Sequence, residues 1–352
     1  MRRSRLHAGA WWLWAIGLVV AATRTRNPLL LGAILAVSGL VVAARRPTTA
    51  WAGGYRFYLQ VAGVVVAVRT AFRILLGGGF GTEVLFTLPA IAAGGVEVGG
   101  PVTLEAVVAG LYDGLRLATI IACIGAANTL ADPRRLIGSL PKALGGVATS
   151  IVVALSVAPH LVESLHRVRR ARRLRGEAGQ GWRSIRSLLV PVLEDSLQRS
   201  LALAVSMQSR GYGRLGDRPT TRRWATPLAW IALATLATGM FGLLGLAPSP
   251  LWWVLIGIGV GSTVAALALT GRGVVRTRYR PDRWDLAAWL VTGSGLVAAI
   301  GTFLADPTHL NPTVVPLVWP QADPVALTAM AVAAAPAVMA PTLTRAAPLP
   351  DG

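Results

Sequence analysis

The chain has 352 residues, of which 54% are hydrophobic and only 14% are charged. Soluble domains carry about 25% charged residues, so the composition excludes an ordinary soluble enzyme or binding module. The net charge of +19 comes from basic residues that lie beside apolar runs. That placement indicates cytoplasmic segments of an all-α, polytopic helical membrane protein and argues against nucleic acid as a partner.

Eight apolar segments approach the roughly 20 residues needed to cross a bilayer and are predicted to be membrane spans. They cover residues 6–23, 28–44, 57–76, 104–130, 226–246, 251–270, 284–304 and 323–341. The first is predicted to be a retained span, because no convincing cleavage site follows it. Tryptophans at or near span ends are predicted to form interfacial belts. They are Trp11, Trp12, Trp14, Trp252 and Trp253.

The distribution of basic residues predicts the orientation of these spans. With the N-terminus in the cytoplasm, 29 of the 34 basic residues fall in cytoplasmic segments. Only Arg24 and Arg26 fall outside, and Arg69, Arg73 and Arg116 lie within spans. This asymmetry predicts a multi-pass protein of a prokaryotic cell membrane with both termini in the cytoplasm.

The outer half of the membrane region contains a glycine-rich loop and several charges. Residues 77–103 include GGGFG, but the lysine and Ser/Thr of a Walker A loop are missing, so no ATP site is predicted. Asp113 is expected to neutralise Arg69 or Arg73 on a neighbouring span. The alternatives are that these side chains extend toward an interface, or that they form an ion or proton relay, because charges inside a membrane are costly and often functional.

Residues 131–225 differ from the rest and define the domain organisation. The prediction is four spans in 1–130, a cytoplasmic helical segment in 131–225, four spans in 226–343, and a short tail in 344–352. Within the cytoplasmic segment, residues 144–161 are apolar, but crossing the membrane there would place many arginines outside. They are therefore predicted to lie at or just under the membrane surface, or to dip partway into it.

No catalytic or metal site is predicted. No serine or cysteine has a paired base at a recognisable spacing, and Cys123 is the single cysteine. His160 and His166 are six residues apart, which does not place two ligands on one helix face. The expectation is a protein that is not an enzyme and has no cofactor.

Two long helices with a shared pattern are predicted in the cytoplasmic segment, at residues 156–176 and 184–211. Residues 159–167 (PHLVESLHR) align with 191–199 (PVLEDSLQR), so proline, leucine, acid, serine, leucine and arginine recur. Pro159 and Pro191 should each kink a helix, because proline removes one backbone hydrogen bond.

Each of the two helices ends in Arg-Gly. The pairs are Arg175-Gly176 and Arg210-Gly211. Glycine is the usual residue at a helix C-terminus that turns left-handed, so capping alone explains one such pair. Two pairs at the ends of two similar helices indicate a docking role in addition to capping. A guanidinium at a helix tip can bind a carboxylate of a partner bidentately.

These residues resemble the transmembrane T component of energy-coupling factor transporters, the EcfT/CbiQ family. The resemblance covers roughly residues 28–246 and is carried by VTLEAVVAGLYDGLRLATIIA (102–122), NTLADPRRLIGSLPKAL (128–144), LRG (174–176) and QSRGYG (208–213). The family signature is a pair of Ala-Arg-Gly-like triplets that end two long coupling helices. Leu174 and Ser209 stand here where alanine is usual, and both arginines are present.

The resemblance implies a coupling subunit of an ATP-driven importer for a vitamin or a transition-metal ion. Arg175 and Arg210 would each dock in a groove of one of two cytoplasmic ABC ATPase subunits, identical or different. A separate membrane S component would bind the substrate. Anionic lipid head groups at the inner face are a further expected partner of the arginine-rich segment.

The alternative is a self-contained secondary transporter or a membrane-embedded enzyme. Such a transporter typically binds its substrate at mid-membrane, on broken helices in two repeated halves. The repeat in this sequence lies in the cytoplasmic segment instead, which favours the coupling subunit.

Overall fold

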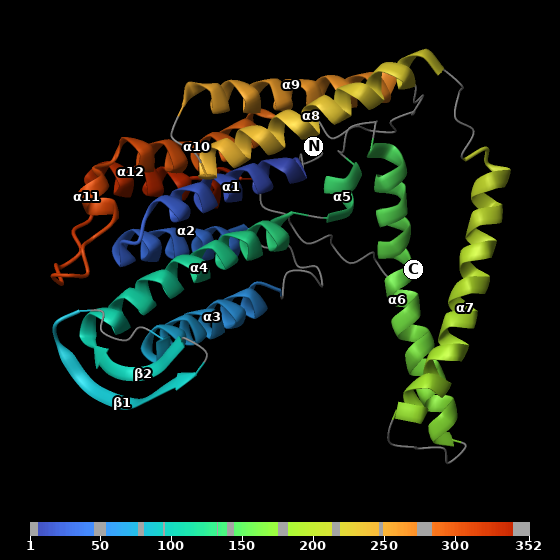
Figure 1. The fold of residues 1–352 in the computed structure, drawn as a ribbon. Coiled ribbons are helices and arrows are strands. Elements are labelled where there is room, and N and C mark those ends of the chain that lie inside the picture. The colour runs from blue at the N-terminus through green and yellow to red at the C-terminus, as the bar shows by residue number, and fades with distance from the viewer. Residues whose placement is uncertain are drawn as a thin grey trace. The chain divides into compact units, whose positions relative to one another are not determined.

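The computed structural model is helical throughout most of the chain (Figure 1). The residues it describes are 6–45, 54–76, 81–93, 96–131, 133–138, 144–174, 182–212, 219–245, 249–272 and 284–340. The long helices are α1 (Ala8–Arg24), α2 (Pro28–Arg45), α3 (Gly54–Leu76), α4 (Leu104–Leu130), α6 (Gly145–Leu174), α7 (Trp182–Ser209), α8 (Pro219–Gly245), α9 (Pro250–Arg272) and α10 (Leu286–Leu304). The short helices are α5 (Pro133–Gly138), α11 (Pro307–Leu310), α12 (Pro324–Ala333) and α13 (Pro336–Met339).

Six of the described helices are long and apolar enough to cross a membrane, which confirms the predicted fold class. They are α2, α3, α4, α8, α9 and α10. The first predicted span is the 17-residue helix α1. The last is divided between α12 and α13, with Pro336 at the start of α13.

The helices form two compact units, and the second is inserted into the sequence of the first. Unit 1 comprises residues 1–136 and 282–352, and unit 2 comprises residues 137–281. In unit 1, α1 packs against α4 and α10, α4 also packs against α2 and α3, and α12 packs against α10. The first and last spans therefore share one core, which includes Trp14, Leu18, Ile34 and Met330.

Small residues allow the helices of unit 1 to approach closely. A Cβ atom added at Gly17 of α1 would lie 2.2 Å from the backbone oxygen of Gly295 in α10. One added at Gly301 would lie 2.2 Å from the Cβ of Ala329 in α12. Close backbone approach at glycine is a common way for membrane helices to associate, since lipid gives them little hydrophobic driving force.

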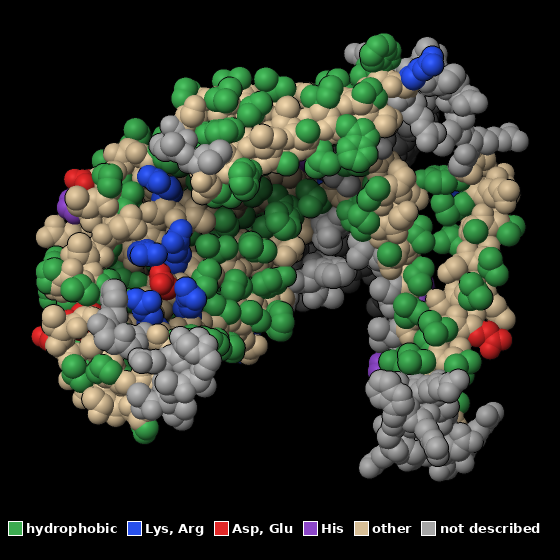
Figure 2. Space-filling model, in the orientation of Figure 1, with side chains coloured by type: hydrophobic (Ala, Val, Ile, Leu, Met, Phe, Trp, Pro, Cys, Tyr) green, Lys and Arg blue, Asp and Glu red, His purple; other side chains and the backbone are tan. Residues whose placement is uncertain are grey.

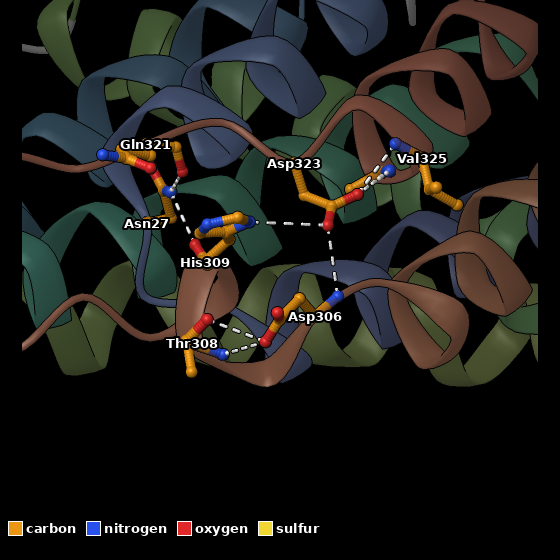
Figure 3. Close-up of polar contacts among 8 residues, drawn as sticks. Asn27, Asp306, Thr308, His309, Gln321, Asp323 and Val325 are labelled. Atoms are coloured by element: carbon orange, nitrogen blue, oxygen red, sulfur yellow. Dashed lines mark hydrogen bonds and ion pairs between the residues drawn. The ribbon is translucent and has the colours of Figure 1, made fainter.

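Buried polar contacts join the two sequence-distant parts of unit 1 at one end (Figure 3). The Asn27 side-chain amide, between α1 and α2, donates to the backbone oxygens of His309 at 2.7 Å and Gln321 at 2.6 Å. Asp323 caps α12 by accepting from the amides of Val325 and Ala326, and it also accepts from Asp306 N at 3.1 Å. These contacts satisfy polar groups that burial would otherwise penalise.

The sequence did not predict a two-stranded antiparallel sheet in the glycine-rich region before α4. It consists of β1 (Val84–Ala93) and β2 (Val96–Thr103). Glu105, in the first turn of α4, accepts from the amide of Thr82 at 2.8 Å and from its hydroxyl at 2.9 Å. The hairpin is thereby tied to the helix that follows it.

The interfacial role predicted for two tryptophans is wrong. Trp14 is fully buried and Trp11 is 6% exposed, and both belong to the core of unit 1. The indole Nε1 of Trp14 donates to the backbone oxygen of Ala333 at 3.0 Å. A buried tryptophan needs such a partner for its N–H group, and α13 begins soon after that acceptor.

Unit 2 contains two helix pairs, α6 with α7 and α8 with α9. The α8–α9 pair is held by glycines that face large side chains. A Cβ added at Gly242 would lie 2.2 Å from the ring of Trp252, so the indole occupies the space above the glycine. Both helices otherwise present mostly exposed apolar side chains, as lipid-facing spans do.

Candidate functional site

The predicted cytoplasmic helices form an antiparallel hairpin of α6 and α7 (Figure 1). The start of α6 meets the end of α7, where the hydroxyls of Thr149 and Tyr212 form a hydrogen bond. The middle of α6 meets the first half of α7 at Ser164 and Asp195. Residues 145–161 form the first part of α6, which continues to Leu174.

The repeated sequence pattern brings its own residues together at the helix crossing. Ser164 comes from the first copy of the pattern and Asp195 from the second. Ser164 is buried and donates a hydrogen bond to the Asp195 carboxylate, which also pairs with Arg199 at 3.2 Å. Both interactions lower the pKa of Asp195, the Ser164 hydrogen bond most. The repeat therefore places a hydrogen bond between the two helices.

The end of α7 is a complete C-terminal cap that includes Gly211. Gly211 has φ 77°, the left-handed conformation, which confirms the cap predicted after Arg210. Its amide donates to Gln208 O at 2.9 Å, and the amide of Tyr212 donates to Met207 O at 3.0 Å. This pair of hydrogen bonds is the Schellman motif, which satisfies the last carbonyl groups of a helix.

The cap is also attached to the neighbouring helix. The Tyr212 ring and Met207 line a pocket between α6 and α7, together with Thr149 and Val153 of α6. The Tyr212 hydroxyl is hydrogen-bonded to Thr149. The tip of α7 is thus fixed by its own cap and by α6. Sequence reasoning missed Tyr212, although an aromatic residue directly after a capping glycine fits the hydrophobic contact of this motif.

The described part of the two tips presents exposed side chains. Arg210 and Ser209 are exposed at the end of α7. Leu174, the last residue of α6, is 90% exposed. The other two predicted docking residues, Arg175 and Gly176, lie outside the described residues. An exposed guanidinium on a fixed helix end is free to meet a carboxylate of another protein.

The sequence also singled out prolines and histidines in these helices. Pro191 lies inside α7, and Pro159 falls within the range of α6, so the two kinks stay predictions. His160 pairs with Glu163 at 3.5 Å on the same helix. The described residues contain no group of three side chains suited to a metal ion.

The intramembrane charges form the interhelical pair that the sequence predicted. Asp113 of α4 lies 4.0 Å from a terminal nitrogen of Arg69 on α3. Its closer partner is Arg26, whose Nε lies 3.3 Å from the other carboxylate oxygen. Sequence reasoning did not include Arg26, because it follows α1 and no spacing rule connects it to α4.

Two comparisons relate the chain to known proteins. Residues 2–222 match the model of the CbiQ family, described as cobalt transport protein. A protein of Bacillus selenitireducens named energy-coupling factor transporter transmembrane protein EcfT is 28% identical over 207 residues. That alignment covers 53% of this chain and 71% of the relative. The family match includes α1–α7 and ends within α8.

Proposed function

This chain belongs to the EcfT/CbiQ family of membrane components of energy-coupling factor transporters, and from this premise we propose a coupling role for it. Two cytoplasmic ABC ATPase subunits, of one or two types, hydrolyse ATP and move the α6–α7 hairpin. The hairpin transmits that motion to a separate membrane subunit that binds the substrate. The cargo is a vitamin or a transition-metal ion, and the family description favours cobalt.

The observation that carries the proposal is the capped tip of α7. Arg210 is exposed on a helix end that the Schellman motif and the contact between Tyr212 and Thr149 hold in place. A rigid tip transmits a push or pull better than a frayed one. The guanidinium is a planar fork suited to a bidentate carboxylate contact. Arg175, directly after the exposed end of α6, is the second docking residue.

An exposed apolar stripe on α7 supports a second docking surface. Leucine or valine recurs at every fourth position, and each of these side chains is exposed. The stripe consists of Leu189, Leu193, Leu197, Leu201 and Val205. Exposed apolar side chains that follow one another along a helix favour an interaction site. We propose that the membrane subunit that binds the substrate docks there, because covering these side chains removes apolar surface from water.

Replacement of both docking arginines tests the proposal. Arg175→Ala with Arg210→Ala should release the ATPases and stop uptake, since losing one partner of a buried charged pair costs about 2–5 kcal/mol. The double lysine variant should be intermediate, because lysine keeps the charge but loses the fork. The measurements are co-purification of the ATPases with the tagged chain and substrate uptake by cells.

The matched control is Arg169→Ala with Arg170→Ala, which removes the same charge from exposed positions on α6. This control should retain the ATPases. The docking proposal would be contradicted if the Arg175→Ala, Arg210→Ala protein folds, reaches the membrane and retains the ATPases at wild-type level.

A further inference from the structure

Four of the five arginines of unit 1 that lie outside the predicted cytoplasmic segments are associated with Asp113 or with the helices beside it. Figure 2 shows blue side chains around a red one on one face. Arg26 and Arg69 both approach Asp113, and Arg73 lines the same pocket as Arg69 and Asp113. Arg116, one helical turn after Asp113, donates to the backbone oxygen of Thr23. We call Arg26, Arg69, Arg73 and Arg116 around Asp113 the outer arginine cluster.

Glycines in α4 place this cluster. A Cβ added at Gly110 would lie 2.9 Å from the Cβ of Arg73. One added at Gly114 would lie 3.0 Å from the Cα of Val66 and 3.5 Å from the Cβ of Arg69. The missing side chains let α3 approach α4, so Arg69 and Arg73 of α3 lie beside Asp113. The arrangement is therefore built into the helix packing.

The described ion pairs of the cluster carry more positive than negative charge. The Asp113 carboxylate is shared between Arg26 and Arg69, so one carboxylate faces two guanidinium groups. Arginine stays charged at any physiological pH. Charges near the membrane are less screened than in water, so an additional anion at this position is strongly favoured.

The pocket in the cluster is amphipathic. Its volume is about 180 Å³, and Arg69, Arg73 and Asp113 line it together with Phe72, Leu76 and Gly110. Phe72 and Leu76 are exposed, as is Val68 one turn before Phe72 on α3. A ligand that fits this surface has a phosphate at one end and hydrocarbon at the other.

The depth of the cluster also fits a lipid head group. Arg73 and Arg69 lie three and seven residues before Leu76, where α3 ends. At 1.5 Å per residue, these positions are about 5 and 10 Å from the helix end. Arginine side chains at such depths extend toward the interface and meet phosphate there.

We propose that the outer arginine cluster binds the phosphate of an anionic phospholipid in the outer half of the bilayer, with the acyl chains along Phe72 and Leu76. The proposal rests on unit 1 alone and does not depend on the docking role of α6 and α7. It assigns these arginines a ligand distinct from the lipid expected at the inner face.

The test uses the purified full-length chain in detergent with fluorescent phosphatidylglycerol, and phosphatidylcholine as the zwitterionic comparison. The wild type should retain phosphatidylglycerol in preference. Arg69→Gln with Arg73→Gln should weaken that binding by on the order of tenfold or more, since hydrogen bonds to charged groups are lost. Arg56→Gln, at the other end of α3, is the charge-matched control for Arg69→Gln alone and should bind as the wild type does.

A second variant changes the binding in the opposite direction. Asp113→Asn removes the single carboxylate of the cluster and should tighten phosphatidylglycerol binding. Thermal unfolding checks that each variant folds, and Arg69→Gln alone replaces the double variant if that one does not. Undiminished phosphatidylglycerol binding by the arginine variants would overturn the proposal. So would displacement of the lipid by millimolar inorganic phosphate, which would indicate a site for the soluble anion.

Discussion

Gly211 controls how Arg210 is presented. Its φ of 77° is unfavourable for residues with a Cβ, by about 1–2 kcal/mol. A substitution there weakens the two hydrogen bonds of the cap and the position of Tyr212. The docking residue itself is unchanged, so the substitution separates the chemistry of the arginine from its placement.

We therefore expect Gly211→Val to reduce ATPase co-purification while Arg210 remains in the sequence. The helix content, measured by circular dichroism, should stay near that of the wild type because α7 loses only its last turn. Gly257→Val in α9 is the control, since no atom lies within 4 Å of its added Cβ and it lies outside the hairpin. Equal ATPase retention by the two variants would show that the cap does not position Arg210.

Asp195 makes the stability of the contact between α6 and α7 depend on pH. Its pKa is lowered, mainly by the Ser164 hydrogen bond and then by Arg199. A carboxylate with a lowered folded-state pKa contributes stability above its ordinary pKa, and this contribution is lost as the pH falls through the folded value. The distance between spin labels on α6 and α7 should therefore increase in acid. Asp195→Asn should remove this dependence; an unchanged acid transition in that variant would assign it to other groups.

At the scale of elements, the sequence predicted where the helices lie in the chain better than which helices pack against each other. The eight apolar segments correspond to helices because length and composition fix a span in lipid. Burial of Trp11 and Trp14 was missed because their partners, α10 and α12, are distant in sequence. The β1–β2 hairpin was missed because each strand contains a proline, Pro89 or Pro101, and proline inside a run argues against a strand. Of the site, Arg210 and Gly211 were predicted, whereas the contact between Tyr212 and Thr149 depends on tertiary packing.

The crossing of α1 and α10 yields a prediction about single methyl groups. Gly17→Ala places a Cβ against backbone, so the helices must separate, at a cost of about 1–3 kcal/mol. Gly32→Ala in α2 meets nothing within 4 Å and should be neutral or stabilise slightly through lower backbone entropy in the unfolded chain. Thermal unfolding in detergent compares the two. An equal midpoint for both variants would contradict the close crossing.

At the scale of the whole molecule, cysteine labelling tests the orientation predicted from charge. Cys123 is the single native cysteine and is buried in α4, so background labelling should be low. A cysteine at Gly179 should resist an impermeant thiol reagent added outside intact cells. Leu317→Cys, at an exposed position between α11 and α12, should react. The reverse pattern would invert the topology and with it the proposed docking face.

The contact between Trp14 and Ala333 has a consequence for biosynthesis. The two residues are 319 positions apart. At about 5–20 residues per second, the ribosome needs roughly 15 to 60 seconds to make the second after the first. During that interval α1 lacks α10 and α12, and the Asn27 amide lacks its acceptors at His309 and Gln321. The first span is therefore completed by the last ones, and a nascent chain that stalls in unit 2 leaves α1 open to membrane chaperones and proteases.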